Sequence, residues 1–410
     1  MRAWDRPALP EVPGRSEPPL LWDSATGGLV PAAPGGDVAT LYVCGITPYD
    51  ATHLGHAATY IAFDTLQRVW RDAGFEVRYA QNVTDVDDPL LERAARDGVD
   101  WRELARTEVD GYRADMAALS VIPPDAFVAV TDIVGPIGGA VAELVARGLA
   151  YAVPAPEASD DGVDVYFDAT AAADVSPWAL GAESGLDRER MLPLFAERGG
   201  DPDREGKRDR LDPLLWRAAR PGEPSWPSPV GEGRPGWHIE CAVIALDELG
   251  EEITVQAGGS DLLFPHHEFS SGHAAALTGR PFARVNAHAG MVAYRGEKMS
   301  KSLGNLVKVS ELVGRGVDPR AIRLAVLAHR YRDDWEWTDA GLAEAEARLA
   351  AWRTAPVTGG EEGELFELRE ALHHDLDTPR ALAAVDAAVA RGGLSPELRA
   401  AVHLLLGVQL

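Results

Sequence analysis

Apolar residues near the start of the chain occur first as a short continuous run and then at helical spacing. Residues 39–44, ATLYVC, form the run, which is typical of a buried strand and stops at Gly45. A helical pattern follows, and we expect Gly74 to end that helix. The apolar face of this helix carries Phe63, Leu66 and Trp70. Residues 76–80 predict the next strand, so the order of elements predicts a doubly wound parallel α/β sheet.

The middle of the chain interrupts this rhythm. Between residues 221 and 235, five of fifteen positions are Pro and three are Gly, which is typical of a rigid linker. A helix over 236–249 and strands over 252–257 and 284–292 are then expected to resume the sheet. The pattern predicts an α/β domain in two segments (1–120 and 236–295), an inserted subdomain (121–235), a loop region (296–338) and a C-terminal helical bundle (339–410).

The last seventy residues have a helical pattern. One amphipathic face carries Leu342, Leu349 and Trp352. Thr378-Pro379 and Ser395-Pro396 each place an N-cap residue before a Pro at the first helical position, which predicts two further helix starts.

Composition limits the class of protein. The 410 residues include 46% hydrophobic and 25% charged residues, as in an ordinary globular protein. No apolar run approaches the roughly 18 residues needed to span a membrane, and the first residues lack the apolar stretch of a secretory signal. We therefore expect a cytoplasmic protein without a membrane partner. Two cysteines, Cys44 and Cys241, exclude a disulfide framework, and two buried thiols are the simplest alternative.

Lysine is rare and concentrated. The chain has four Lys against 35 Arg, and two of the four lie in Lys298-Met299-Ser300-Lys301-Ser302. A compact, mobile ammonium is suited to a phosphate that moves during a reaction, whereas a planar guanidinium is not equivalent. Some 240 residues earlier stands His53-Leu54-Gly55-His56, at a predicted helix start that favours anions. Taken alone, the two His could be capping or surface residues, and the Lys pair a solvated loop.

Together, these two motifs resemble the HxGH and KMSKS motifs of class I aminoacyl-tRNA synthetases. The cysteine-activating branch is the most similar, because Glu197-Arg198-Gly199-Gly200-Asp201-Pro202 matches a motif of that group. The resemblance covers nearly the whole chain and implies a Rossmann/HUP-like fold that binds ATP, with Mg²⁺, for adenylyl transfer. It also implies four catalytic residues at the phosphates: His53, His56, Lys298 and Lys301.

The resemblance further implies one zinc ion per chain. In cysteinyl-tRNA synthetases, positions matching Cys44, Cys241 and His266 bind zinc, and a Glu four residues after the His is the fourth ligand. Here that position is Ser270. Three protein ligands with an open position are typical of a reactive zinc site, which would hold a substrate thiolate far better than a hydroxyl. Glu268 is an alternative fourth ligand, and two buried thiols near a core His remain the simpler interpretation.

Predicted strand ends indicate where the ligands bind. In an open α/β sheet the carboxyl ends of the strands form the binding crevice. By resemblance, Thr47, Thr84 and Trp237 shape the cysteine pocket, and Asp261 binds the ribose hydroxyls unless it is only a buried cap. The full set of expected ligand-binding residues is Cys44, Gly45, Ile46, Thr47, Thr59, Asn82, Val83, Thr84, Trp237, Gly259, Ser260, Asp261 and Val292.

Charge bears on the acceptor of the cysteinyl group. Net charge is −25, and residues 340–410 carry six Arg and eleven Asp or Glu, a poor surface for a tRNA anticodon. Residues 45–56, GITPYDATHLGH, and the missing zinc ligand resemble the cysteine ligases of mycothiol biosynthesis. That resemblance implies a monomer that joins L-cysteine to the amine of glucosaminyl-inositol through cysteinyl-adenylate, releasing AMP and diphosphate, with no nucleic-acid partner. The alternatives are a truncated cysteinyl-tRNA synthetase and a non-catalytic zinc- or nucleotide-binding regulator.

Overall fold

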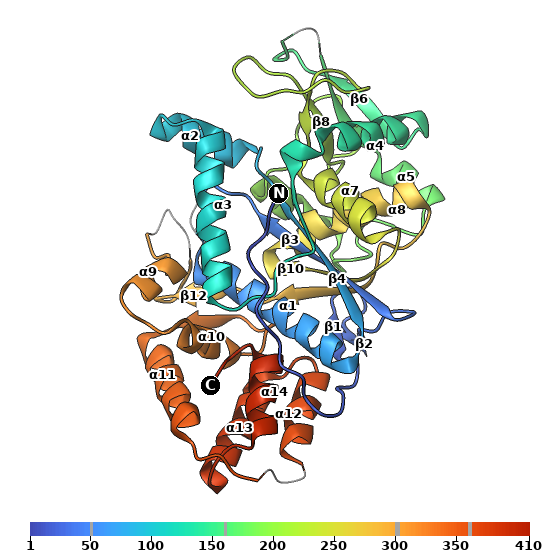
Figure 1. The fold of residues 1–410 in the computed structure, drawn as a ribbon. Coiled ribbons are helices and arrows are strands. Elements are labelled where there is room, and N and C mark those ends of the chain that lie inside the picture. Colours follow the sequence, from blue (N-terminus) through green and yellow to red (C-terminus); the bar gives the residue numbers. More distant parts are fainter. Residues whose placement is uncertain (50–51, 160–161, 300–303, 360–362) are drawn as a thin grey trace.

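A parallel sheet organises the molecule (Figure 1). The computed structural model describes residues 1–49, 52–159, 162–299, 304–359 and 363–410. Five strands pair in parallel in the order β11-β10-β3-β4-β5. Their bounds are β3 Val38–Ile46, β4 Glu76–Val83, β5 Ala126–Ala129, β10 Ile253–Gly259 and β11 Ala283–Ala289. The doubly wound parallel sheet predicted from the sequence is confirmed.

Helices cover both faces of this sheet. Side chains alternate along a strand, so Leu41 and Val43 of β3 belong to one hydrophobic cluster and Tyr42 and Cys44 to another. Helix α1 (Leu54–Ala73) lies in the first cluster, and α7 (Trp237–Leu249) and α8 (Glu268–Thr278) lie in the second. Gly74 ends α1 in the left-handed conformation, as expected. Between β4 and β5 run α2 (Asp88–Asp97) and α3 (Trp101–Ala118).

The segment predicted as an insertion begins with a strand of the central sheet. β5 lies beyond residue 120 and still pairs with β4, so the sheet reaches into this segment. An antiparallel sheet of order β6-β7-β8-β9 follows. The other elements are η1 (Val130–Asp132), α4 (Val134–Ala146), β6 (Ala150–Pro154), β7 (Val163–Phe167), α5 (Ala169–Val175), α6 (Arg188–Glu197), β8 (Leu214–Ala218) and β9 (Gly233–Pro235). The domain boundaries themselves stay predictions.

The C-terminal part joins a small sheet to a set of helices. Strands β12 (Val292–Tyr294), β13 (Glu297–Lys298) and β14 (Trp335–Trp337) form the sheet. The strand expected over 284–292 is confirmed up to Ala289, where β11 ends, but its predicted end is wrong, because Val292 begins β12. The helices are α9 (Val309–Gly314), α10 (Pro319–Leu327), α11 (Asp339–Thr354), α12 (Glu364–His373), α13 (Thr378–Arg391) and α14 (Pro396–Leu406). A hairpin of β1 (Leu20–Asp23) and β2 (Gly28–Pro31) precedes the central sheet.

One of the two predicted helix caps is shifted. Ser395 caps α14, since its side chain accepts a hydrogen bond from the N–H of Leu398. At α13 the cap is Asp377, whose carboxylate accepts from the N–H of Arg380, and Thr378 is already helical. None of the helices in the described ranges combines the length and apolar character needed to cross a membrane.

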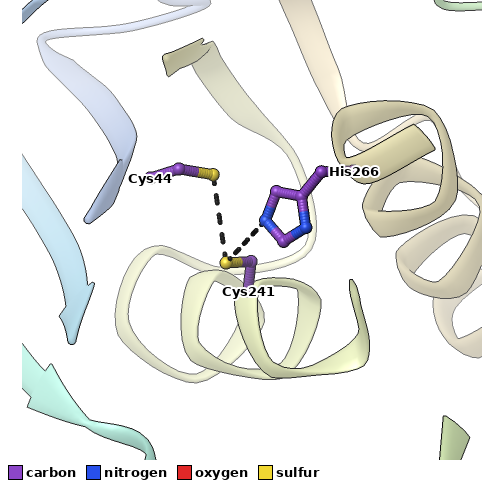
Figure 2. A group of neighbouring side chains, drawn as sticks. All are labelled: Cys44, Cys241 and His266. Atoms are coloured by element: carbon purple, nitrogen blue, oxygen red, sulfur yellow. Dashed lines mark hydrogen bonds between the residues drawn. The ribbon is translucent and has the colours of Figure 1, made fainter. Parts of the chain in front are cut away.

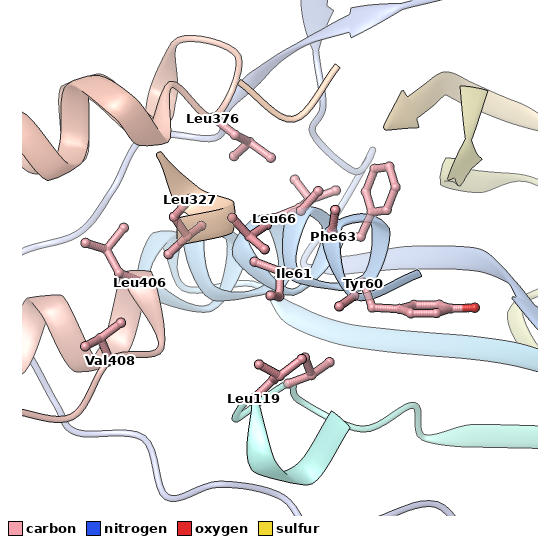
Figure 3. Packing of buried hydrophobic residues seen from close by; sticks show 14 of the residues in the cluster. Tyr60, Ile61, Phe63, Leu66, Leu119, Leu327, Leu376, Leu406 and Val408 are labelled. Atoms are coloured by element: carbon pink, nitrogen blue, oxygen red, sulfur yellow. The ribbon is translucent and has the colours of Figure 1, made fainter. Parts of the chain in front are cut away.

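A buried ion cluster ties α1 to the C-terminal helices. Arg68 Nε donates to Asp64 Oδ2 at 2.7 Å, and Arg323 of α10 donates to the same carboxylate. Arg323 also donates to the carbonyl of Leu406 at 2.6 Å, and Arg68 to that of Leu404 at 2.9 Å. Figure 3 shows apolar packing in the same region, with Ile61 and Leu66 of α1 near Leu327, and with Leu406 and Val408 at the C-terminal end of the same hydrophobic cluster. Ion pairs and hydrogen bonds therefore connect the middle of α1 to α10 and to the end of α14.

Candidate active site and metal centre

A cavity of about 600 Å³ lies at the carboxyl ends of the central strands. Its volume suits a ligand the size of a nucleotide. Eleven of the expected site residues line it: Cys44, Gly45, Ile46, Thr47, His53, His56, Thr59, Trp237, Gly259, Asp261 and Val292. Seven further lining residues were not predicted: Tyr49, Tyr60, Leu262, Gly290, Met291, Met299 and Leu306.

The HxGH turn forms the start of α1. His53 is the N-cap, and its Nδ1 accepts a hydrogen bond from the N–H of Gly55 at 3.1 Å. The rings of His53 and His56 lie 4.0 Å apart. Burial lowers the pKa of His56 to about 4, so this imidazole is neutral at pH 7. A Cβ on Gly55 would lie 2.8 Å from the His53 ring, which explains the glycine. The turn presents a helix N-terminus to the cavity, and the N–H groups there favour binding of an anion.

The segment after the KMSKS motif returns to this turn. The N–H of Leu54 donates to the carbonyl of Val307 at 2.9 Å, so the two motifs are connected through the backbone. Lys298 ends β13 and pairs with Ala293, and Met299 lines the cavity. Lys301 lies outside the described residues, and its contact with phosphate stays a prediction.

Three potential metal ligands meet beside the cavity (Figure 2). Cys44 comes from the end of β3, Cys241 from the first turns of α7, and His266 from η3 (Leu263–His267), which precedes α8. The sulfurs of Cys44 and Cys241 are 3.9 Å apart, and His266 Nε2 is 3.2 Å from Cys241 Sγ. Tetrahedral zinc with bonds of about 2.3 Å to sulfur separates two sulfurs by about 3.8 Å. The donor set therefore fits zinc.

The two thiols have different acidities. Burial raises the pKa of the Cys44 thiol well above its usual value. Burial acts in the same direction on Cys241, but hydrogen bonds from Cys44 and His266 and the charge of His266 outweigh it and hold the pKa of Cys241 well below its usual value. The lowered pKa of Cys241 favours its thiolate form, which is the form that binds a thiophilic cation.

Neither alternative fourth ligand points at the metal donors. The Glu268 carboxylate accepts hydrogen bonds from three residues of a neighbouring loop: Trp178, Gly181 and Ser184. The Ser270 hydroxyl donates to the carbonyl of His266 at 2.8 Å and of His238 at 3.1 Å. Within the described residues, the set that can share one ion contains only Cys44, Cys241 and His266.

A chain of hydrogen bonds supports Cys44 from behind. His267 Nε2 lies 3.1 Å from Cys44 Sγ, and His267 Nδ1 lies 2.8 Å from His288 Nε2. The chain continues to Ser24, whose hydroxyl is 2.8 Å from His288 Nδ1. Burial, together with neighbouring His charges, holds the pKa of His267 well below its usual value. The amino-acid sequence carries no signal for this row of hydrogen bonds, because the residues that form it lie on four separate segments.

Residues of β4 act behind the cavity. Asn82 Oδ1 accepts from the N–H of Gly45 at 2.7 Å, and its amide donates to the Thr84 hydroxyl at 3.0 Å. Thr84 in turn donates to Glu240 at 3.1 Å. Asn82 and Thr84, like Val83 and Ser260, are not among the lining residues. The structure therefore places Asn82 as a support for the end of β3.

Two unpredicted residues shape the cavity through the backbone. The Tyr60 hydroxyl donates to the carbonyl of Cys44 at 3.1 Å, one helical turn after His56. Gly290 donates to the carbonyl of Tyr331 at 2.8 Å, and a Cβ there would lie 2.1 Å from the carbonyl of Asp333. The position of Tyr60 in the first turns of the predicted helix was an available signal, whereas the contact of Gly290 was not.

Comparison with known proteins agrees with this geometry. Residues 33–347 match the family described as tRNA synthetases class I (C) catalytic domain. A relative from Clavibacter michiganensis subsp. michiganensis (strain NCPPB 382), an L-cysteine:1D-myo-inositol 2-amino-2-deoxy-alpha-D-glucopyranoside ligase, is 62% identical over 100% of this chain and 99% of its own length. The ligase of the same name from Mycolicibacterium smegmatis (strain ATCC 700084 / mc(2)155) is 55% identical over 100% of both chains.

Solved structures share the fold at low identity. Methionyl-tRNA synthetase from Mycobacterium tuberculosis, in complex with methionyl-adenylate, superposes with a TM-score of 0.63 and 18% identity, covering 87% of this chain and 82% of that chain. The leucyl enzyme from Agrobacterium radiobacter K84, in a ternary complex with tRNA, gives 0.58 and 12%, covering 91% and 84%. These likenesses show a class I synthetase fold.

Proposed function

Because the chain belongs to the class I cysteinyl synthetase family and, within it, to the L-cysteine:1D-myo-inositol 2-amino-2-deoxy-alpha-D-glucopyranoside ligases, we propose that it joins L-cysteine to the amine of glucosaminyl-inositol at the expense of ATP. The observation that carries this proposal is the nucleotide-sized cavity between the HxGH turn and the Cys44, Cys241 and His266 cluster. Activation of an amino acid with a thiol needs both features at one place.

The first step forms cysteinyl-adenylate. The cysteine carboxylate oxygen attacks the α-phosphorus of ATP, and the bond from phosphorus to diphosphate breaks. His53 and His56 donate hydrogen bonds to phosphate oxygens at the start of α1, where the helix N-terminus also favours negative charge. Lys298 and Lys301 neutralise the leaving diphosphate, which ATP brings with Mg²⁺. Thr59, Gly259 and Asp261 line the adenylate.

Selection of cysteine uses the metal cluster. Bound zinc would bind the substrate thiolate at its open position and would bind a serine hydroxyl poorly, so an editing site is unnecessary. Cys44, Cys241 and His266 would hold the ion, and Thr47 and Trp237 line the cavity beside it. Trp237 also stacks on the His266 ring at 4.3 Å, which limits rotation of that imidazole.

The second step forms the amide. The neutral sugar amine attacks the cysteinyl carbonyl carbon, a C–N bond forms, and AMP leaves with the electrons of the anhydride bond. The amine proton passes to solvent. In this proposal the enzyme acts as a monomer in the cytoplasm. A nucleic acid takes no part in the reaction, because the C-terminal helices carry a net negative charge that would repel its phosphates.

The experiment that tests this function follows both half-reactions. Cysteine-dependent ATP–diphosphate exchange is expected first, followed by AMP release on addition of glucosaminyl-inositol. Total tRNA is the competing acceptor, and AMP release with tRNA alone would refute the proposal. Absence of exchange in zinc-loaded protein would refute activation itself.

Variants of the metal cluster give the matched control. Cys241→Ala is expected to lose bound zinc and to reduce exchange by more than about 100-fold, since one of three ligands is removed. Ser270→Ala is expected to retain both, because its hydroxyl bonds only backbone carbonyls in the structure. Stoichiometric zinc and full activity in Cys241→Ala would refute the metal site.

A further inference from the structure

The Glu197–Pro202 motif lies outside the cavity, yet one of its side chains reaches the cavity wall. Arg198 follows the last residue of α6, in the inserted segment. Its Nη1 donates to the carbonyl of Asp261 at 2.6 Å and to the carbonyl of Phe264. Asp261 lines the cavity, and His266, a metal donor, comes two residues after Phe264. A single guanidinium therefore contacts the segment that connects the two halves of the site.

This segment needs outside support because its helix is interrupted. η2 (Ser260–Leu262) is followed by η3, and Phe264, the second residue of η3, has extended backbone angles of φ −140° and ψ 135°. An extended residue breaks the regular hydrogen bonding of a helix, so carbonyls around it require other donors. A charged guanidinium that donates to both carbonyls makes stronger hydrogen bonds than a neutral donor.

The rest of the motif fixes Arg198 to the insertion. The Lys207 side chain is only 2% exposed, and its ammonium donates to Asp201 Oδ1 at 2.9 Å. The same ammonium lies over the rings of Tyr166 and Phe195. A Cβ on Gly200 would lie 2.5 Å from the Phe195 ring, so this residue must be Gly for the turn to close. These contacts hold the backbone of the motif in place within the insertion, and Arg198 is the side chain of the motif that contacts the segment lining the cavity.

We propose that Arg198 is a positioning residue that holds Asp261 in the nucleotide cavity and His266 in the metal cluster at the same time. Its contacts are to backbone carbonyls, so it acts through the placement of these two residues. The inference rests on the proposed function, because it assigns Asp261 to the adenylate and His266 to zinc. It gives the inserted segment a part in assembling the site.

The test compares Arg198→Met, Arg198→Lys and Arg210→Met. Met removes the donors, Lys keeps a charge that can reach one carbonyl, and Arg210 is the control. The Arg210 side chain is 57% exposed and bonds only Asp203 and the carbonyl of Pro202, within the same insertion. Two quantities are measured: the KM for ATP in diphosphate exchange with saturating zinc, and the dissociation constant for Zn²⁺ by competition with a chromophoric chelator.

Arg198→Met is expected to raise both quantities by about tenfold or more while kcat changes less than about threefold. Arg198→Lys is expected to fall between Met and wild type, and Arg210→Met to match wild type. Unchanged values in Arg198→Met, or a change in only one of them, would overturn the joint role. If Arg198→Met fails to fold, Arg198→Lys carries the test. The chelator titration needs no turnover, so it tests the inference even if the wild-type protein shows no exchange.

Discussion

The imidazole nitrogen Nε2 of His267 lies 3.1 Å from the sulfur of Cys44, and this contact determines the tautomers behind the metal cluster. With a metal on Cys44, the sulfur would carry no proton, so His267 would donate through Nε2 and accept through Nδ1. His288 would then donate through Nε2 and accept the Ser24 hydroxyl at Nδ1. This row of hydrogen bonds would give the buried sulfur one donor.

Replacement of His267 should weaken the metal site. His267→Phe keeps a ring of similar size and removes the donor to Cys44. We expect the affinity for Zn²⁺ to fall by about 10- to 100-fold, the usual effect of losing a hydrogen bond to a metal ligand. The measurement is chelator competition, with Ser270→Ala as the control that keeps every donor. A His267→Phe protein with wild-type affinity would show that the contact is only packing.

Gly45 should tolerate no side chain. A Cβ there would lie 1.6 Å from the carbonyl oxygen of Asn82, so β3 and β4 would have to separate at the cavity. We expect Gly45→Ala to reduce diphosphate exchange by about 100-fold or more, because small displacements at a reacting centre are costly.

The control for Gly45 is another glycine. Gly111 lies inside α3, and a Cβ there would have no neighbour within 4 Å. Gly111→Ala should therefore keep full exchange and raise the free energy of unfolding by about 0.5–1 kcal/mol. Equal activity of the two variants would contradict the close approach at Gly45.

Asp64 should be a major contributor to stability. Asp64→Asn leaves the buried Arg68 and Arg323 without their shared carboxylate, and we expect a loss of about 3–5 kcal/mol in the free energy of unfolding. Asp5→Asn, at a fully solvated ion pair with Arg2, should cause no measurable loss. Urea denaturation followed by circular dichroism measures both.

The same carboxylate predicts a response to acid. Burial would raise the pKa of Asp64, but the charges of Arg68 and Arg323 outweigh it and lower the pKa in the folded protein. Its stabilisation is therefore present above the unfolded value of about 4 and is lost as pH falls through the lower folded value. The wild-type protein should lose stability over this acidic range more steeply than Asp64→Asn. Parallel curves would contradict the assignment.

His273 should make stability pH-dependent in a higher range. Burial lowers the pKa of His273 to about 3, whereas an unfolded His titrates near about 6.5. Between these values only the unfolded chain binds the proton, so stability falls as pH decreases from about 6.5, by up to about 1.4 kcal/mol per pH unit. His273→Met should reduce this slope. Comparison at pH 8, where His is neutral in both states, removes the effect of altered packing, and an unchanged slope would contradict the prediction.

Local patterns predicted the sheet well where a strand or helix has its own signal. The run at 39–44 lies within β3, and Gly74 and Ser395 end and begin helices as expected. The cap of α13 is Asp377 and not the expected Thr378, and the hydrogen bond to the N–H of Arg380 identifies it. The break between β11 and β12 falls at Gly290, where the backbone packs against that of Asp333.

In the candidate site, too, some residues could be identified from the sequence, whereas the roles of others depend on contacts between distant segments. The resemblance to cysteinyl-tRNA synthetases brought Cys44, Cys241 and His266 into one hypothesis, and the structure places them together. Asn82 was expected to contact ligand, whereas its amide holds the backbone of Gly45. Strand register decides this, because Asn82 faces Gly45 only when β3 and β4 pair as they do. A motif identifies chemistry, but pairing between strands determines which side chain contacts the ligand and which supports it.

The residues of the ion cluster at Asp64 are synthesised at very different times during translation. Its carboxylate and first guanidinium are made early, its second guanidinium comes with α10, and the carbonyls of residues 404 and 406 come some 80 residues later still. A nascent chain can thus form the turn at His53 long before the helix behind that turn has its final partners. Helix α1, whose first turn lines the cavity, has its full set of ion-pair and hydrogen-bond partners only after the ribosome has translated α14.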